Sequence, residues 1–155
     1  MMVHALVSDA SMIRLLPGAQ FADTFCVKTS DESLTARQAA ERMFNRPPRW
    51  IAVLMRLRNA IVAPLGLKTP SHDKTASANS VGLFPVISET PQRIVAGFDD
   101  SHLDFRVIVD VSGTPPERAV TATTLVLTHN LLGRLYLAVI MPFHRMIVPA
   151  MLRRI

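Results

Sequence analysis

The sequence predicts a single α+β domain in which a curved antiparallel sheet wraps around a long C-terminal helix. Three observations support this fold class. Residues 81–128 contain short β-branched or alternating segments separated by turn-like clusters. Residues 131–152 are apolar on almost every side of a helix, so that helix needs cover on several sides. A chain of 155 residues has the size of one domain, 1–155, and such a domain buries roughly 70% of its extended surface.

The first strand is expected at residues 20–28. There the odd-numbered residues, which include Phe21 and Val27, alternate with the smaller Ala22, Thr24 and Cys26, as in a strand with two different faces. A helix follows, for which Thr35 is the expected N-cap and Gln38 completes a capping box. This helix should end by Asn45, because Pro47 disfavours the helical conformation in the residue before it.

A second short helix should begin at Pro48, since proline suits the first turn of a helix. Its residues Trp50, Leu54, Leu57 and Ile61 recur at the spacing of one buried face. It should end before Pro64. The polar, aperiodic residues 67–80 are then expected to form a mobile loop, and whether that loop closes over a site is left open.

Four further strands are expected at residues 81–87, 93–98, 103–111 and 119–128. In residues 103–111 apolar side chains alternate with polar ones, so this strand has one dry face and one wet face. Asp104 and Arg106 share the wet face, and we expect them to pair with neighbouring strands on the exterior of the sheet. The short connections imply an antiparallel meander.

The last element is a helix from Leu131, with Asn130 as its expected N-cap. Its broad apolar face is expected to include Leu132, Leu135, Tyr136, Val139, Ile140, Phe143, Ile147 and Ala150. Gly133 allows another backbone to approach closely near its start. Pro142 and Pro149 each remove a backbone hydrogen bond, so the helix should be bent or interrupted there.

The segments DSHLDFR and HNLLGRLY…PFHRMIV carry a family resemblance. They lie within VGLFPVISETPQRIVAGFDDSHLDFRVIVDV and TTLVLTHNLLGRLYLAVIMPFHRMIVPAML, and the similarity runs from LPGAQFAD at Leu16 to Met151. The chain resembles the bacterial domain-of-unknown-function family 2867 (DUF2867). The resemblance implies the helix-grip architecture of the START and Bet v 1-like (SRPBCC) superfamily, often with a cavity between sheet and C-terminal helix. It implies no catalytic residues.

Charge and hydropathy exclude several classes of protein. The formal net charge is +5, and six arginines between Arg37 and Arg58 face the single acid Glu41. No aromatic residues interleave with them, so a solvated face is favoured over specific nucleic-acid binding. The longest unbroken apolar run, Leu135 to Phe143, is shorter than the ~20 residues of a transmembrane helix. With no signal-peptide pattern and Cys26 as the one cysteine, we expect no transmembrane segment and a cytoplasmic protein.

Metal and cofactor motifs are absent from the sequence. The histidines form no HxH or HxxxH pair, and Asp99 and Asp100 belong to a turn whereas His102 and Asp104 belong to a strand. No metal is therefore expected. No cofactor is expected either, because a glycine-rich phosphate loop, a GxSxG elbow and a dinucleotide fingerprint are all missing.

The candidate ligand-binding residues are Trp50, Phe98, Phe105, His129, Arg134, Tyr136 and His144. Tyr136 and His144 share the broad face of the last helix and are the candidates for acid–base chemistry. The favoured alternative is that each satisfies a buried polar atom with a backbone carbonyl. Arg134 could orient a ligand carboxylate. The cavity itself is either open or filled by large side chains.

Three functions are compatible with these residues. The favoured one is binding of a small apolar or amphipathic ligand in a cavity between the sheet and the C-terminal helix. The second is an enzyme of the cyclase or hydratase kind that uses residues in that cavity. The third is an interaction module whose arginine-rich helices meet an anionic partner or membrane surface. Enzymatic activity and a homodimer are left open.

Overall fold

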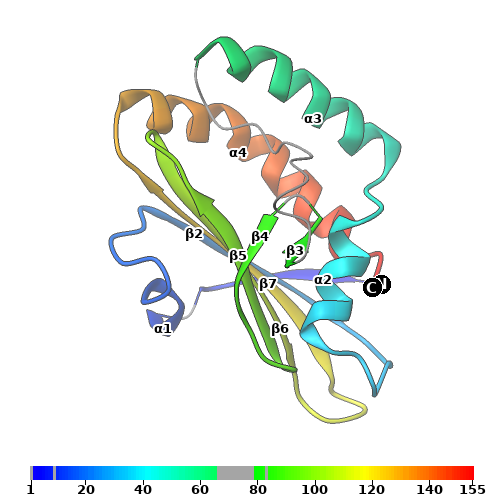
Figure 1. Cartoon of the computed structure of the whole chain (residues 1–155). Coiled ribbons are helices and arrows are strands. Elements are labelled where there is room, and N and C mark those ends of the chain that lie inside the picture. Colours follow the sequence, from blue (N-terminus) through cyan, green and yellow to red (C-terminus); the bar gives the residue numbers. More distant parts are fainter. Residues whose placement is uncertain (1, 9, 66–78, 83) are drawn as a thin grey trace.

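The computed structural model describes residues 2–8, 10–65, 79–82 and 84–155 (Figure 1). The elements follow one another as β1 (Val3–Leu6), α1 (Ala10–Ile13), β2 (Phe21–Lys28), α2 (Ala36–Phe44), α3 (Arg49–Val62), a 3-10 turn (Ala63–Leu65), β3 (Ser80–Val81), β4 (Phe84–Glu89), β5 (Arg93–Asp99), β6 (Leu103–Ser112), β7 (Ala119–Thr128) and α4 (Leu131–Leu152). The fold is therefore α+β with a C-terminal helix, as the sequence predicts. The expected mobile loop, 67–80, lies outside the described residues except for Asn79 and Ser80.

Within the described ranges, seven strands form one curved antiparallel sheet in the order β1-β2-β7-β6-β5-β4-β3. The predicted meander is present from β3 to β7, and β2 joins it by pairing with β7 over its full length. The strand expected at residues 81–87 is divided into β3 and β4. β1 was not predicted, because its four residues carry no alternation, and it extends the sheet beside β2.

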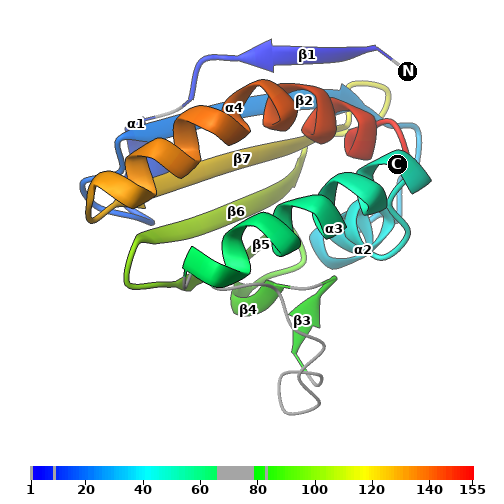
Figure 2. The ribbon, with the colours of Figure 1, turned by 90° about the horizontal axis from the view of Figure 1, so that it is seen from above.

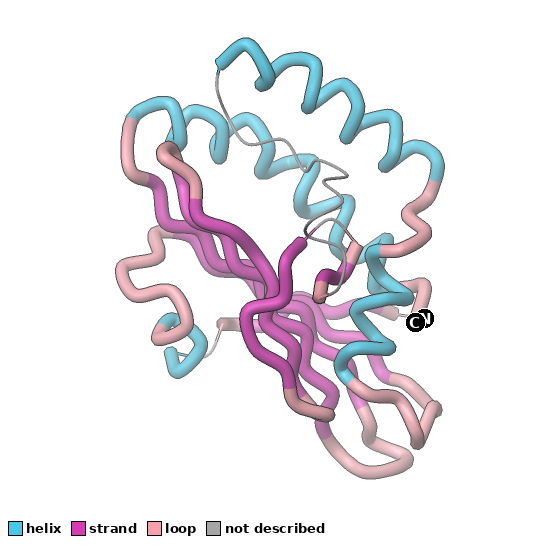
Figure 3. The backbone as a smooth tube through the Cα atoms, viewed as in Figure 1, coloured by secondary structure: helices cyan, strands magenta, loops and turns pink. Residues whose placement is uncertain are grey.

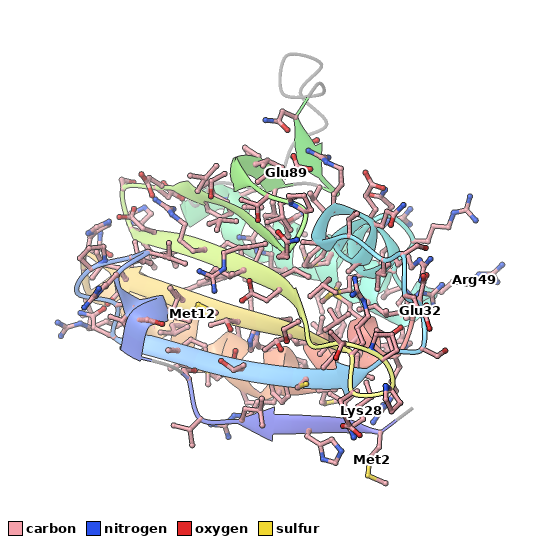
Figure 4. The ribbon with its side chains drawn as sticks, turned by 90° about the horizontal axis from the view of Figure 1, so that it is seen from below. Met2, Met12, Lys28, Glu32, Arg49 and Glu89 are labelled. Atoms are coloured by element: carbon pink, nitrogen blue, oxygen red, sulfur yellow. The ribbon has the colours of Figure 1, made fainter. Side chains whose placement is uncertain are left out.

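The two faces of the sheet are covered differently. Helices α2, α3 and α4 lie on one face, with α3 and α4 side by side (Figures 2 and 3). The opposite face is covered in part by α1, whose Met12 packs with Leu16 against Ile108 and Leu125 (Figure 4). Because strand side chains alternate between faces, the odd-numbered side chains of β6 and the even-numbered ones of β7 point toward the three helices.

Helix α2 is fixed to the sheet by its cap and by one ion pair. The backbone N–H of Gln38 donates to Thr35 Oγ1 (3.2 Å), and that of Thr35 donates to Gln38 Oε1 (3.0 Å), which confirms the capping box. Asn45 is the C-cap, as expected. Arg37 donates to both carboxylate oxygens of Glu89 on β4, each at 2.7 Å. These hydrogen bonds hold the pKa of Glu89 below its ordinary value.

Helix α3 presents a different side to the sheet from the one predicted. Ile51 is buried, whereas Trp50, Leu57 and Ile61 are 43%, 56% and 59% exposed. The prediction that Trp50, Leu57 and Ile61 share a buried face is therefore wrong. The helix is apolar on two adjacent stripes, so spacing alone does not decide which stripe faces inward. The stripe that contains Ile51 is the inner one.

Helix α4 begins at the predicted cap, with the backbone N–H of Gly133 donating to Asn130 Oδ1 at 2.9 Å. It runs without interruption through Pro142 and Pro149, and its axis curves (Figure 1). Of the two effects expected from these prolines, bending is the one observed. A Cβ at Gly133 would collide with the carbonyl oxygen of His102, so the predicted close backbone approach is present.

The sheet covers α4 on one side only. Val148 and Leu152 are buried in the main core, whereas Leu135, Val139 and Phe143 are 60%, 63% and 43% exposed. The prediction that the helix is buried on several sides is wrong. Helix α3 lies beside α4 and not over it, so in the described chain the side of α4 that faces away from the sheet is exposed. By length and composition α4 is apolar enough to cross a membrane, and little of it is buried inside the protein.

Replacing Gly133 with Ala tests the close contact with His102. In an ordinary helix this change stabilises by about 1 kcal/mol. Here we expect a loss of about 1–3 kcal/mol, because the added methyl group forces α4 away from the β5–β6 turn. Thermal unfolding measures the change, with Ala138→Gly at an exposed position of the same helix as the reference for helix propensity. A more stable Gly133→Ala protein would contradict the packing described.

A second pair of substitutions tests the one-sided burial of α4. Leu152→Ala should cost about 2–5 kcal/mol, since its side chain is fully enclosed. Phe143→Ala should change stability by no more than roughly 1 kcal/mol, because much of the ring already meets solvent. Urea unfolding compares the two. Equal losses would mean that the outer side of α4 is enclosed.

Candidate ligand-binding cavity

A cavity of about 230 Å³ lies between the sheet and the helices α3 and α4. Its floor is the sheet face made by β2, β5, β6 and β7, and its walls come from the inner sides of α2, α3 and α4. The lining is largely apolar and includes Phe21, Met43, Phe44, Ile51, Met55, Phe84, Phe98, Leu103, Phe105, Val107, Ala122, Val126, Leu137, Ile140, Met141, Ile147, Val148 and Met151. Of the two alternatives left by the sequence, open or filled, the structure shows a cavity.

Four phenylalanine rings form the end of the cavity nearest α2 and β4. The Phe84 ring packs edge-on against Phe44 with centroids 5.7 Å apart, and lies 5.2 Å from Phe105. Phe98 lies 5.7 Å from Phe105. Rings in tilted and edge-to-face contact hold one another in place. This end is therefore a rigid apolar wall.

A polar pair lies between α3 and α4. The Arg58 Nε donates to the hydroxyl oxygen of Tyr136 at 2.7 Å, and the guanidinium lies 5.3 Å from the centroid of the same ring. Both side chains line the cavity. A tyrosine hydroxyl that accepts one hydrogen bond still carries a hydrogen to donate. The pair thus offers a donor beside a permanent positive charge.

Asp100, Thr124 and His144 are further polar residues of the lining, and His144 lies in the middle of α4. Its Nε2 lies 3.1 Å from Asp23 Oδ1 and 2.9 Å from Oδ2, and its ring meets Phe21 edge-on at 5.8 Å. Asp23 belongs to β2 and points toward α4 with the odd-numbered side chains of that strand. The sequence favours a structural role for His144, with a backbone carbonyl as its partner. His144 does have a polar partner, but the partner is the side-chain carboxylate of Asp23.

The structure brings four of the seven predicted site residues together. Phe98, Phe105, Tyr136 and His144 all line the cavity. Trp50 does not, because it points outward from α3. His129 and Arg134 also lie outside it, since each belongs to a surface turned away from the cavity.

His129 and the acidic residues near it belong to the exterior of the sheet. The His129 Nε2 lies 2.9 Å from Asp104 Oδ1, and Arg106 lies 2.8 Å from Asp99. Arg106 therefore pairs with a neighbouring strand, β5, as expected, whereas Asp104 pairs with His129, one residue after the end of β7. Over the part of the chain that the structure describes, no three histidine, cysteine or acidic side chains gather as metal ligands would.

Sequence reasoning missed Arg58, Asp23 and several apolar lining residues. Arg58 follows Ile51 and Met55 at i, i+4, i+7 spacing, which is the available signal for its place on the inner stripe. Phe21 and Asp23 point to the same face of β2, so a carboxylate lies next to an apolar neighbour on that face. A buried carboxylate requires a partner, and that requirement points to a histidine elsewhere in the chain.

Comparison with known families identifies the chain. Residues 15–151 match the model of a family described as "Protein of unknown function (DUF2867)". The chain belongs to this family. The match spans the sheet from β2 to β7 and almost all of α4, so it covers every element that lines the cavity of this DUF2867 protein. No curated protein and no solved structure shows significant similarity to the chain.

Proposed function

We propose that this DUF2867 protein binds a small apolar or amphipathic ligand between the sheet and the helices α3 and α4. The cavity of about 230 Å³ carries the proposal. Ligand sites are typically concave and apolar, with a few polar groups that fix orientation. The ring cluster around Phe84 supplies the apolar part of such a site, and Arg58, Tyr136 and His144 supply the polar groups.

The volume limits the ligand to a small molecule. An apolar cavity of about 150 Å³ in another protein is large enough to hold benzene. The cavity here suits a single substituted ring or a short alkyl chain rather than a sterol or a diacyl lipid. The ring or chain would lie against Phe84, Phe98 and Phe105.

The Arg58–Tyr136 pair selects the polar end of the ligand. The phenolic hydrogen of Tyr136 can be donated to an acceptor on the ligand, and the guanidinium favours a negative one. A carboxylate on a short alkyl or aromatic body matches both groups. The preferred ligand class is therefore a small apolar carboxylic acid.

Membership of the helix-grip START and Bet v 1-like superfamily is part of the same proposal. The curved antiparallel sheet and its long C-terminal helix support it, and the position of the cavity between these elements is the one such an architecture implies. The bacterial origin and the cytoplasmic address stay predictions from the sequence.

An enzymatic function is the second candidate, and the His144–Asp23 pair is the observation that favours it. A carboxylate that holds one imidazole nitrogen orients the ring for proton transfer at the other. The cyclase- or hydratase-like alternative therefore has an acid–base group in the wall of the cavity. The mass of a bound ligand recovered after incubation separates the two functions, since conversion that is lost in His144→Asn would favour the enzyme.

Thermal unfolding with a series of acids, from butanoic to decanoic acid together with benzoic and phenylacetic acids, tests the binding function. A ligand at a hundred times its dissociation constant stabilises by about 2.7 kcal/mol, a shift of roughly 5–10 °C for a domain of this size. Val107→Phe fills the cavity from the floor and should abolish the shift while the protein stays folded. Val7→Phe adds the same group at a position that is 97% exposed, and serves as the control. The proposal fails if no acid raises the melting temperature.

Tyr136→Phe tests the polar end of the site separately. Removing the hydroxyl should weaken binding of the best acid by about 0.5–1.5 kcal/mol, which is the usual contribution of one hydrogen bond. Binding of the corresponding hydrocarbon, such as toluene in place of phenylacetic acid, should not change. Isothermal titration calorimetry gives both affinities. An equal loss for acid and hydrocarbon would show that Tyr136 acts by packing alone.

A further inference from the structure

The side of α3 and α4 that faces away from the sheet is strongly apolar. We call it the outer face, and it comprises Trp50, Val53, Leu57 and Ile61 of α3 with Leu131, Leu135, Val139, Phe143 and Met146 of α4. These side chains are between 43% and 81% exposed. The two helices lie side by side on the same side of the sheet (Figure 2). Because both exposed stripes belong to the sides that face away from the sheet, we treat them as one surface. Contiguous apolar surfaces of this kind mark interaction sites.

The exposed apolar residues of each helix lie on one side of that helix, because they recur at intervals of three or four residues. On α3 the exposed residues follow at intervals of three, four and four, and on α4 at intervals of four, four, four and three. The inner sides of both helices are occupied by the cavity and the core. Each helix therefore has two apolar sides, of which the fold uses one.

Arginines border the outer face on both flanks. At 3.6 residues per turn, Arg49 and Arg56 lie on the flank of α3 opposite to Arg58, and Arg58 reaches toward Tyr136 on α4. Arg49 and Arg56 therefore border the side away from α4. Arg145 lines a groove with β1 and β2, and Arg134 shares its flank of α4. The surface thus has an apolar centre and a cationic rim.

The two helices supply no negative charge to balance this rim. Neither α3 nor α4 contains an aspartate or a glutamate. Among the described residues, Arg49, Arg56, Arg134 and Arg145 have no carboxylate within ion-pair distance. A partner that covers the face must therefore accept apolar side chains at its centre and supply anions around them.

We propose that the outer face docks on the surface of an anionic lipid bilayer. Helices that lie in a bilayer interface have aromatic and aliphatic residues on one side and arginines beside them, and the apolar side enters by roughly 5–10 Å. Arginine side chains extend along the apolar surface to reach phosphate groups with their guanidinium ends. This function is independent of the cavity, since none of the outer-face residues lines it.

Other occupants fit the surface less well. In a two-fold dimer the same patch meets itself, which would bring arginine rim against arginine rim with no acid on either side. A nucleic acid matches the arginines but offers no apolar surface for Leu57, Val139 and Phe143, because its outer surface is a row of phosphates.

The structure favours a helix that lies on the bilayer over one that crosses it. Although α4 is apolar enough to span by length and composition, its inner side is tied to the sheet at Gly133, His144 and Leu152. Crossing would require those contacts to break and Arg134 and Arg145 to enter the hydrocarbon region, which is costly. Docking needs no change in the fold.

Trp50 supplies a direct test, since it is the one tryptophan of the chain and belongs to the outer face. The full-length protein is mixed with vesicles of phosphatidylcholine alone, or with a third of that lipid replaced by phosphatidylglycerol. We expect the Trp50 emission to move to shorter wavelength, and the protein to sediment, with the anionic vesicles. Binding should weaken as salt is added, because the arginine rim is solvent-exposed.

Matched variants assign the binding to the outer face. Leu57→Ser with Val139→Ser should reduce vesicle binding about tenfold or more, since both side chains lose their apolar burial. Arg56→Gln with Arg134→Gln should reduce it by a factor of about five for each charge and should remove the preference for anionic lipid. The controls are Ile87→Ser, which is 52% exposed on β4, and Arg14→Gln beside α1, and both should bind as the parent does.

Three results would overturn the proposal. The parent protein could stay in solution with both kinds of vesicle. The Leu57→Ser, Val139→Ser variant could sediment as strongly as the parent, which would place binding elsewhere. Sedimentation velocity could show a dimer of the parent that this variant dissociates, which would assign the face to a second copy of the chain. The melting temperature of each variant shows that the comparison is between folded proteins.

Discussion

The seating of α4 on the sheet is the constraint on which the rest of the structure depends. It needs a glycine at Gly133, because the carbonyl of His102 occupies the space where a side chain would begin. It also needs an apolar anchor near the other end, which Val148 and Leu152 provide within the main core. Between these ends His144 contacts Asp23 of β2. The cavity lies between the helix and the sheet, and α3 is one of its walls.

The secondary structure could be predicted closely because its signals are local. The capping box of Thr35 and Gln38, the Asn130 cap and the alternation along β6 each involve neighbours in sequence. The helix orientations could be predicted only in part, because α3 and α4 are apolar on more than one side. Which side faces inward depends on distant partners, such as Arg58 with Tyr136 and His144 with Asp23.

The residues of the candidate site fall into the same two groups, those with a local signal in the sequence and those without one. Phe98, Phe105, Tyr136 and His144 could be predicted from strand parity and helix spacing, which are periodic signals. Arg58 and Asp23 could not, because a charged residue on an inward stripe becomes visible only when its partner is known. The prediction that Trp50 faces the cavity is wrong for the same reason as the predicted buried face of α3, namely that this helix is apolar on two stripes. A large aromatic side chain is a weak guide to the inner face of a helix that carries a second apolar stripe.

The uninterrupted course of α4 through Pro142 has a mechanical consequence. Proline lacks the N–H that would bond to the carbonyl four residues earlier, so the helix is weakened just before His144, whose contact with Asp23 ties it to β2. The least stiff part of α4 therefore lies between Gly133 and His144. On the proposed ligand-binding function, this part of the helix would adjust to the bulk of an apolar body beneath it. Such a site would accept a homologous series of apolar bodies and bind each one more tightly with a carboxylate than without it.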